Sequence, residues 1–169
     1  MKAHFAGFAR YNAWANRRLY EAAAGLSDAQ LRADEGAFFG SLHATLNHLL
    51  VTDVIWMARI RGLQGPPWRL DHIAHEDFAD LRAAREALDA DIIEGVDALR
   101  ESDISAGEIA YTRVTSPEPI VQPLAGALAH LFNHQTHHRG QCHMILTRLT
   151  GRAPELDLLF YQREAKAAA

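Results

Sequence analysis

The stretch Asn133-His134-Gln135-Thr136-His137-His138-Arg139-Gly140-Gln141 lies in the segment that decides the fold, a helix predicted at about residues 123–150. Apolar residues recur along that helix at steps of three and four, which is the spacing of a buried face; they are Leu124, Ala127, Leu131, Cys142, Ile145 and Leu149. His134 and His138 continue this stripe at positions where Leu or Ile is usual. Burying an unpaired imidazole costs on the order of 1–3 kcal/mol. We therefore expect a metal ion or a fully hydrogen-bonded polar network around these two histidines.

The rest of the chain predicts three further long helices. The first, at about residues 3–24, ends at Gly25, after which Ser27 and Asp28 are placed to cap a short helical turn. The second begins after Ser41 and ends near residue 61, and it is apolar over much of its circumference, which is typical of a mostly buried helix. The third, from about residue 77 to 99, is amphipathic. Gly151 ends the last helix, and residues 156–163 are expected to pack as a final turn or short helix.

The connections complete the predicted fold. Residues 62–76 contain two glycines and two prolines and are expected to form a surface loop or a lid. Between residues 102 and 123 the periodicity changes, and residues 109–114 and 119–122 are predicted to form a short β-hairpin. The sequence therefore predicts an all-α fold, a four-helix bundle whose long crossover contains this hairpin. Residues 1–169 are expected to form a single domain.

The composition excludes several classes of protein. The 17 Lys and Arg residues are scattered among 21 Asp and Glu, and the net charge of -4 argues against nucleic acid as a partner. The most apolar window, residues 49–60, is interrupted by Asp53 and Arg59 and is shorter than the ~20 residues of a membrane span. The single cysteine, Cys142, cannot form an internal disulfide and is interpreted as a small buried side chain in preference to a reactive thiol. No secretion signal is evident, so a cytoplasmic location is expected.

The histidine spacing favours a metal site. His134 and His138 are four residues apart, so their side chains lie one above the other on the same helix face and can share one ion. Two ligands from one helix rarely complete a site, and the second helix offers both His43 and His48, between which periodicity cannot choose. Asp53 falls on the stripe of that second helix, where a structural hydrogen bond or a contact to a ligand is favoured over direct ligation.

Two other residues of that histidine-rich helix are displaced from its buried face. His130 sits at the edge of the stripe, and His137 is rotated about 100° from His138, toward a neighbouring groove or solvent. Neither is therefore preferred as a ligand.

Three segments, taken together and in order, resemble the DinB family. They are Tyr11-Asn12-Ala13-Trp14-Ala15-Asn16-Arg17-Arg18-Leu19, then Leu46-Asn47-His48-Leu49-Leu50 leading to Trp56, and the histidine-rich run quoted above. The resemblance covers essentially the whole chain. It implies a DinB/YfiT-like four-helix bundle, commonly a homodimer, with a divalent metal held by three histidines. Residue by residue, these ligands correspond to His48, His134 and His138, so the resemblance favours His48 over His43.

Three neutral imidazoles leave at least one coordination position open, as in catalytic metal sites. Zinc is the default ion and nickel also suits nitrogen ligands. The resemblance implies a metal-dependent enzyme acting on a small-molecule substrate, of the thiol-dependent S-transferase or isomerase type, with bacillithiol, mycothiol or glutathione as co-substrate. A metal-dependent hydrolase using metal-bound water is the close alternative. A non-catalytic dimeric bundle with a structural or sensory metal is the alternative from another class.

No residue beyond the three ligands is assigned a catalytic role. Asn12 continues the stripe of the first helix, and it is interpreted either as lining the pocket or as making a hydrogen bond in the core. Arg139 is interpreted either as binding an anionic substrate or, more commonly for such a position, as a solvated or ion-paired arginine.

Overall fold

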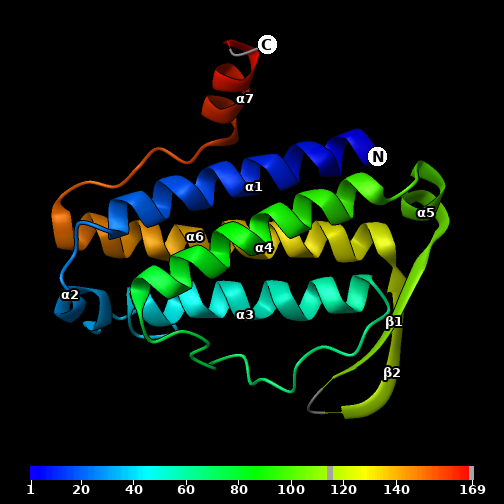
Figure 1. Ribbon diagram of the computed structural model, residues 1–169, viewed down its shortest axis with the longest axis horizontal. Coiled ribbons are helices and arrows are strands. Elements are labelled where there is room, and N and C mark those ends of the chain that lie inside the picture. Colours follow the sequence, from blue (N-terminus) through cyan, green and yellow to red (C-terminus); the bar gives the residue numbers. More distant parts are fainter. Residues whose placement is uncertain (114–115, 168–169) are drawn as a thin grey trace.

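Four long helices form the body of the protein, whose computed structural model describes residues 1–113 and 116–167. They are α1 (Lys2–Ala23), α3 (Leu42–Ile60), α4 (Phe78–Ala98) and α6 (Leu124–Thr150), and Figure 1 shows them running side by side along the longest axis. Both α1 and α3 pack against α4 and against α6. Helices α1 and α3 therefore occupy opposite corners of the bundle. The predicted all-α bundle is confirmed.

Five shorter elements connect and flank the bundle: α2 (Asp28–Arg32), α5 (Glu101–Ala106), β1 (Glu108–Arg113), β2 (Ser116–Pro123) and α7 (Leu158–Ala167). Strands β1 and β2 pair antiparallel, with Ile109 opposite Gln122, which confirms the predicted hairpin. The predicted strand residue Val114 and the turn residue Thr115 lie outside the described residues. Helix α5 was not predicted, because six residues are too few to show a helical period.

Local sequence explains where the helices begin and end. The Ser27 side chain accepts a hydrogen bond from Gln30 N and starts α2 with a capping box. The Ser41 side chain caps α3 by accepting from Ala44 N, and the Asp77 side chain caps α4. Gly151 follows α6 with φ 75°, a left-handed conformation in which glycine has no Cβ penalty. The predicted helix boundaries are thus met within a few residues.

Polar side chains divide the interior of the bundle into two apolar clusters. One cluster contains Phe5 and Ala9 of α1 with Ile92 and Val96 of α4, and the other contains Leu19 of α1 with residues from the other three long helices. Each long helix has buried polar residues between the segments that supply these clusters. Among them are Asn12 and Asn16 in α1, Asp53 in α3, Arg85 and Asp89 in α4, and Gln135 and Arg139 in α6.

The apolar breadth of α3 is accounted for within the chain. Besides α4 and α6, it contacts α2 and β1. The loop between α3 and α4 also folds onto it, since Asn47 of α3 exchanges hydrogen bonds with the backbone of His75 at 3.0 and 3.1 Å. The composition of α3 therefore gives no separate argument for a partner protein.

Helix α7 packs on the outside of α1, where Figure 1 shows it at the far side from α3. Trp14 Nε1 donates to Glu164 Oε2 at 2.7 Å, and Tyr11 Oη donates to Leu156 O at 2.7 Å. The expected packing of the tail is therefore observed. Within the part of the chain that the structure describes, no helix combines the length and apolar character that crossing a membrane requires.

Candidate metal centre

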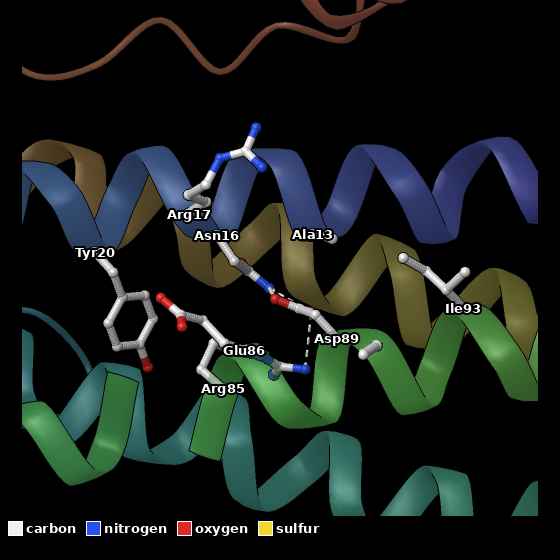
Figure 2. Close-up of a pocket in the computed structure, with 9 residues that line it drawn as sticks. Ala13, Asn16, Arg17, Tyr20, Arg85, Glu86, Asp89 and Ile93 are labelled. Carbon is white, nitrogen blue, oxygen red and sulfur yellow. Dashed lines mark hydrogen bonds and ion pairs between the residues drawn. The ribbon is translucent and has the colours of Figure 1, made fainter. Parts of the chain in front are cut away.

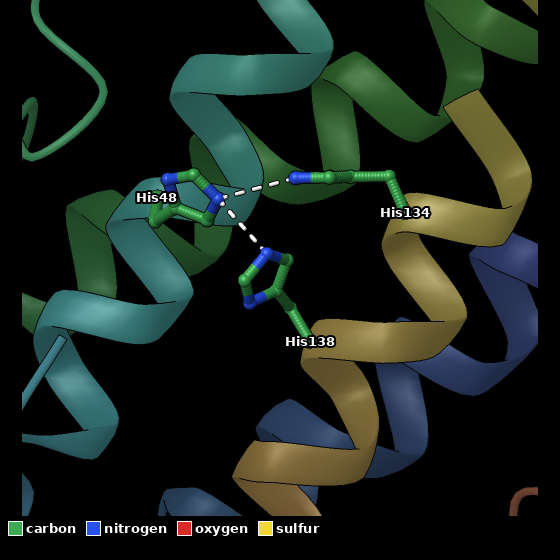
Figure 3. Close-up of side chains that lie close together, drawn as sticks. All are labelled: His48, His134 and His138. Atoms are coloured by element: carbon green, nitrogen blue, oxygen red, sulfur yellow. Dashed lines mark hydrogen bonds between the residues drawn. The ribbon is translucent and has the colours of Figure 1, made fainter. Parts of the chain in front are cut away.

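Three histidine side chains from two helices converge inside the bundle. His48 comes from α3, and His134 and His138 come from successive turns of α6 (Figure 3). His48 Nε2 lies 3.3 Å from His134 Nε2 and 3.2 Å from His138 Nε2. Nitrogen ligands about 2.0–2.1 Å from a tetrahedral zinc ion are roughly 3.3 Å apart. The separation of the donor atoms therefore fits a divalent metal site.

Hydrogen bonds on the far side of two rings determine which nitrogens face one another. His48 Nδ1 lies 2.8 Å from the carbonyl oxygen of Leu70, and His138 Nδ1 lies 2.9 Å from Gln141 Oε1. Both partners are acceptors, so both Nδ1 atoms carry the proton and both Nε2 atoms present a lone pair. Two lone pairs 3.2 Å apart repel each other unless a cation lies between them. The tautomers therefore point to a metal more strongly than the spacing alone.

Burial keeps these imidazoles neutral. Loss of hydration lowers the pKa of His48 to about 4 and that of His134 to about 3, and it also lowers the pKa of His138. A neutral imidazole is the form that binds a metal. His134 Nδ1 is buried and has no hydrogen-bond partner among the described residues. The three rings are thus neutral at neutral pH, which is the form that could bind a metal ion.

An aromatic wall covers one side of the cluster. The ring of Phe39 stacks on His48 with centroids 3.9 Å apart, and it lies 5.6 Å from the ring of His138. Phe38 packs edge-on against Phe39 and is 82% exposed. Both aromatic residues belong to the loop before α3, in which Gly36 and Gly40 have positive φ. The approach to the histidines from this loop is therefore apolar.

The remaining histidine candidates do not join the cluster. His43 is buried, but its Nε2 lies 3.0 Å from Glu76 O and 3.4 Å from Asn47 Nδ2, so it tethers the loop to α3. His130 and His137 are exposed. The structure thus brings together the three histidines that the resemblance indicated, and it places His43 in a structural role.

Three further residues from the sequence reasoning lie in the bundle core. Asp53 is fully buried and accepts from Arg85 Nη1 and Gln135 Nε2, as expected for a structural hydrogen bond. Asn12 is buried and accepts from Arg139 Nη1, which matches the core alternative considered for it. The setting of Arg139 differs from both expectations, because this arginine is only 2% exposed and donates to neutral side chains.

Cys142 lies in the apolar core and is fully buried. Burial raises the pKa of its thiol to about 12. The interpretation of Cys142 as a small core residue is confirmed.

Sequence reasoning missed Arg85, Asp89 and Gln135. The available signal was the apolar stripe of α4, which runs from Leu81 to Leu88 and is interrupted by Arg85 at a core position. The contact between the carbonyl oxygen of Leu70 and His48 could not be predicted from the sequence, because every residue has a backbone carbonyl whatever its side chain.

A separate pocket of about 220 Å³ opens between α1 and α4 (Figure 2). Asn16 and Tyr20 line it from α1, and Arg85 and Asp89 line it from α4. None of its lining residues belongs to α3 or α6. This pocket therefore approaches the buried polar residues from outside and is distinct from the histidine cluster.

The sequence model of the DinB family matches residues 1–168, which is essentially the whole chain. The protein therefore belongs to the DinB family. A search of curated proteins gave no significant match.

Proposed function

Starting from this DinB family membership, we propose that the protein is a metal-dependent enzyme whose divalent ion is held by His48, His134 and His138. The proposal rests on the number of potential ligands. In the described part of the chain, the cluster that could hold a metal ion consists of three histidine side chains. A structural zinc site is normally closed by four protein ligands, whereas a catalytic site keeps a position for water or substrate. Zinc is the preferred ion and nickel is the second candidate, because both suit imidazole nitrogen.

The chain's own residues prepare the site. Leu70 O and Gln141 Oε1 accept from the two Nδ1 atoms, which orients the rings of His48 and His138 and raises their basicity. Phe39 shields one side of His48 from solvent. When bound, a divalent metal would supply Lewis-acid activation of a thiol, a water molecule or a carbonyl group.

The reaction class that we propose is thiol-dependent S-transfer or isomerisation of a small electrophilic substrate, with a low-molecular-weight thiol as co-substrate. Support for the thiol comes from the resemblance to thiol-dependent members of the family. Hydrolysis is the competing outcome of the tests below. A homodimer in the cytoplasm completes the proposal. The homodimer rests on the resemblance, and the location rests on the single cysteine, which forms no internal disulfide.

The first test is elemental analysis of the protein purified without an affinity tag. We compare the wild type with His134→Ala/His138→Ala and with His137→Ala/His143→Ala, which removes the same number of histidines from α6. The proposal expects a stoichiometric metal in the wild type and the control, and its loss from the first variant. Absence of metal from the wild type, with no uptake from added zinc or nickel, would refute the metal site.

The second test separates the reaction classes. The metal-loaded protein is assayed with electrophiles in the presence of bacillithiol, mycothiol or glutathione, and with ester and amide substrates without thiol. Turnover that requires both metal and thiol supports transfer or isomerisation, whereas thiol-independent turnover identifies a hydrolase. A metal that stabilises the fold without any turnover favours the structural or sensory alternative.

A further inference from the structure

Six buried side chains from the four long helices form a closed ring of hydrogen bonds and ion pairs next to the histidine cluster. We call it the buried polar ring; its members are Asn12 of α1, Asp53 of α3, Arg85 and Asp89 of α4, and Gln135 and Arg139 of α6. Each member is at most 6% exposed. The ring therefore connects all four corners of the bundle at one level.

One half of the ring joins α3 to α4 and α6. Asp53 Oδ2 accepts from Arg85 Nη1 at 2.8 Å and also accepts from Gln135 Nε2. Gln135 Nε2 lies 3.3 Å from the carbonyl oxygen of Leu49 as well. A single amide group of α6 thus contacts both the backbone and a side chain of α3.

The other half closes the ring through α1. Arg139 Nη1 donates to Asn12 Oδ1 and lies 3.4 Å from Gln135 Oε1. Asn12 Nδ2 lies 3.4 Å from Asp89 Oδ1, which is 3.0 Å from Arg85 Nη2. Figure 2 shows the contact between Arg85 and Asp89, with Asn16 attached to the same carboxylate.

The ring balances its own charge. Its two carboxylates, Asp53 and Asp89, are matched by two guanidinium groups, Arg85 and Arg139. A buried charge is tolerated when it is paired and hydrogen-bonded. Because the ring is neutral as a whole, it does not need an ion from outside.

Two ring members and one residue whose backbone carbonyl contacts the ring are the immediate chain neighbours of the proposed metal ligands. Leu49 follows His48, Gln135 follows His134, and Arg139 follows His138. Residues adjacent on a helix point about 100° apart, so the histidines face one another while their neighbours face the ring. A shift of α6 along α3 would therefore have two effects at once: it would break the contacts of Gln135 with α3, and it would change the distances between His48 Nε2 and the histidine nitrogens of α6.

We propose that the buried polar ring is a positioning device for the metal site, in which Gln135 and Arg139 fix α6 against α3 and so set the separation of the three imidazoles. This inference rests on the proposed metal-binding function. Apolar side chains of similar volume can match the stability of a buried ion pair. Directional hydrogen bonds add a defined register between helices, which is what a site requires when its α3 donor atom lies 3.2 and 3.3 Å from the two donor atoms of α6.

The test uses Co²⁺ as a spectroscopic probe in the full-length protein. Gln135→Met replaces one neutral side chain with another of similar volume, but it removes the contacts with Leu49 O and Asp53 Oδ2 of α3. We expect Co²⁺ to bind 10- to 100-fold more weakly, as is typical when a group that supports a ligand is lost, and its visible absorbance bands to shift. The matched control is Ile145→Val on the same helix, which loosens the apolar core without touching the ring and should leave the affinity and the spectrum unchanged.

Arg139→Lys provides a second variant that retains the positive charge. Lysine has a single nitrogen in place of the planar fork, whose Nη1 contacts Asn12 and Gln135 while Nη2 contacts Thr136, so it should also weaken Co²⁺ binding. If the wild type binds Co²⁺ and both ring variants bind it with the same affinity and spectrum, the positioning role is overturned while the metal site stands. If the wild type binds no Co²⁺, the proposed function fails and the ring has no site to position.

Discussion

The histidine cluster and the buried polar ring both place polar atoms inside the same bundle, but they satisfy them differently. In the ring, both carboxylates pair with Arg85, and Asn12, Gln135 and Arg139 close the ring through hydrogen bonds. In the cluster, Nε2 lone pairs face one another, and His134 Nδ1 finds no partner among the described residues. The formal charges of the ring cancel without a ligand, whereas the cluster brings together lone pairs that could hold a cation. Both regions contain buried atoms without a hydrogen-bond partner in the described structure, such as Asp53 Oδ1, Arg85 Nε and His134 Nδ1. The two regions therefore differ in the kind of groups that they bring together, opposite charges in the ring and neutral imidazoles in the cluster.

The largest expected effect comes from breaking the ring at its central charge. Arg85→Met leaves Asp53 and Asp89 without their shared cation. An uncompensated charge in the interior destabilises a protein by roughly 3–5 kcal/mol. We expect a loss of that size in the free energy of unfolding measured by urea denaturation.

Arg82→Met is the matched control for this change. Arg82 lies on the same helix, and its partner Glu86 is exposed. Exposed ion pairs contribute about 0–1 kcal/mol. An equal loss in both variants would show that Arg85 does not act through the ring.

A smaller loss is expected when the pair is removed together. In Asp53→Leu/Arg85→Met one carboxylate disappears together with Arg85, and buried pairs replaced by apolar groups often regain stability. Asp89 still loses its cation and keeps only its contacts with Asn12 and Asn16. We therefore expect the double variant to be more stable than Arg85→Met but less stable than the wild type, with a coupling energy of about 1–3 kcal/mol in the double-mutant cycle. Its affinity for Co²⁺ should nevertheless stay reduced, because Gln135 has lost its contact with Asp53. Full recovery of both stability and affinity would contradict a positioning role.

A still smaller loss of stability is expected in the histidine cluster. His134→Ala removes a ring whose Nδ1 makes no hydrogen bond in the described structure. We expect the metal-free protein to change by about 1 kcal/mol or less, as for substitutions outside the main destabilising classes. Excess metal should stabilise the wild type, by about 2.7 kcal/mol at a concentration of 100 Kd, but not this variant.

Thermal and urea unfolding with and without zinc measure this difference, and His137→Ala is the control on the exposed side of α6. A loss of several kcal/mol in metal-free His134→Ala would indicate that the cluster itself supports the fold.

The difference between the two regions also explains what the sequence could predict. Periodicity identified the stripe of α6 and the two histidines on it, because both properties are local to one helix. The third proposed ligand, His48, is 86 residues from His134, and spacing alone could not distinguish it from His43. The resemblance made that choice, and the convergence of the three Nε2 atoms agrees with it.

The ring was less accessible to sequence reasoning. Its links join residues as far apart as Asn12 and Arg139, which are separated by 127 positions. Isolated charged residues such as Arg85 are usually solvated, and only the gap that it makes in an apolar stripe shows that it is buried. The carbonyl of Leu70, which orients His48, leaves no trace in the side-chain pattern at all.

The smallest expected effect concerns Cys142, which reports on opening of the core. Because burial raises the pKa of its thiol to about 12, the native protein holds almost no thiolate at pH 8. Alkylation by iodoacetamide therefore requires the core to open. We expect His134→Ala to react within about fivefold of the wild type, since 1 kcal/mol changes an opening equilibrium by about that factor. Arg85→Met should react at least about 100-fold faster, in line with its larger loss of stability. Equal acceleration in both variants would mean that the cluster and the ring open as one unit, and the distinction between a site and its scaffold would fail.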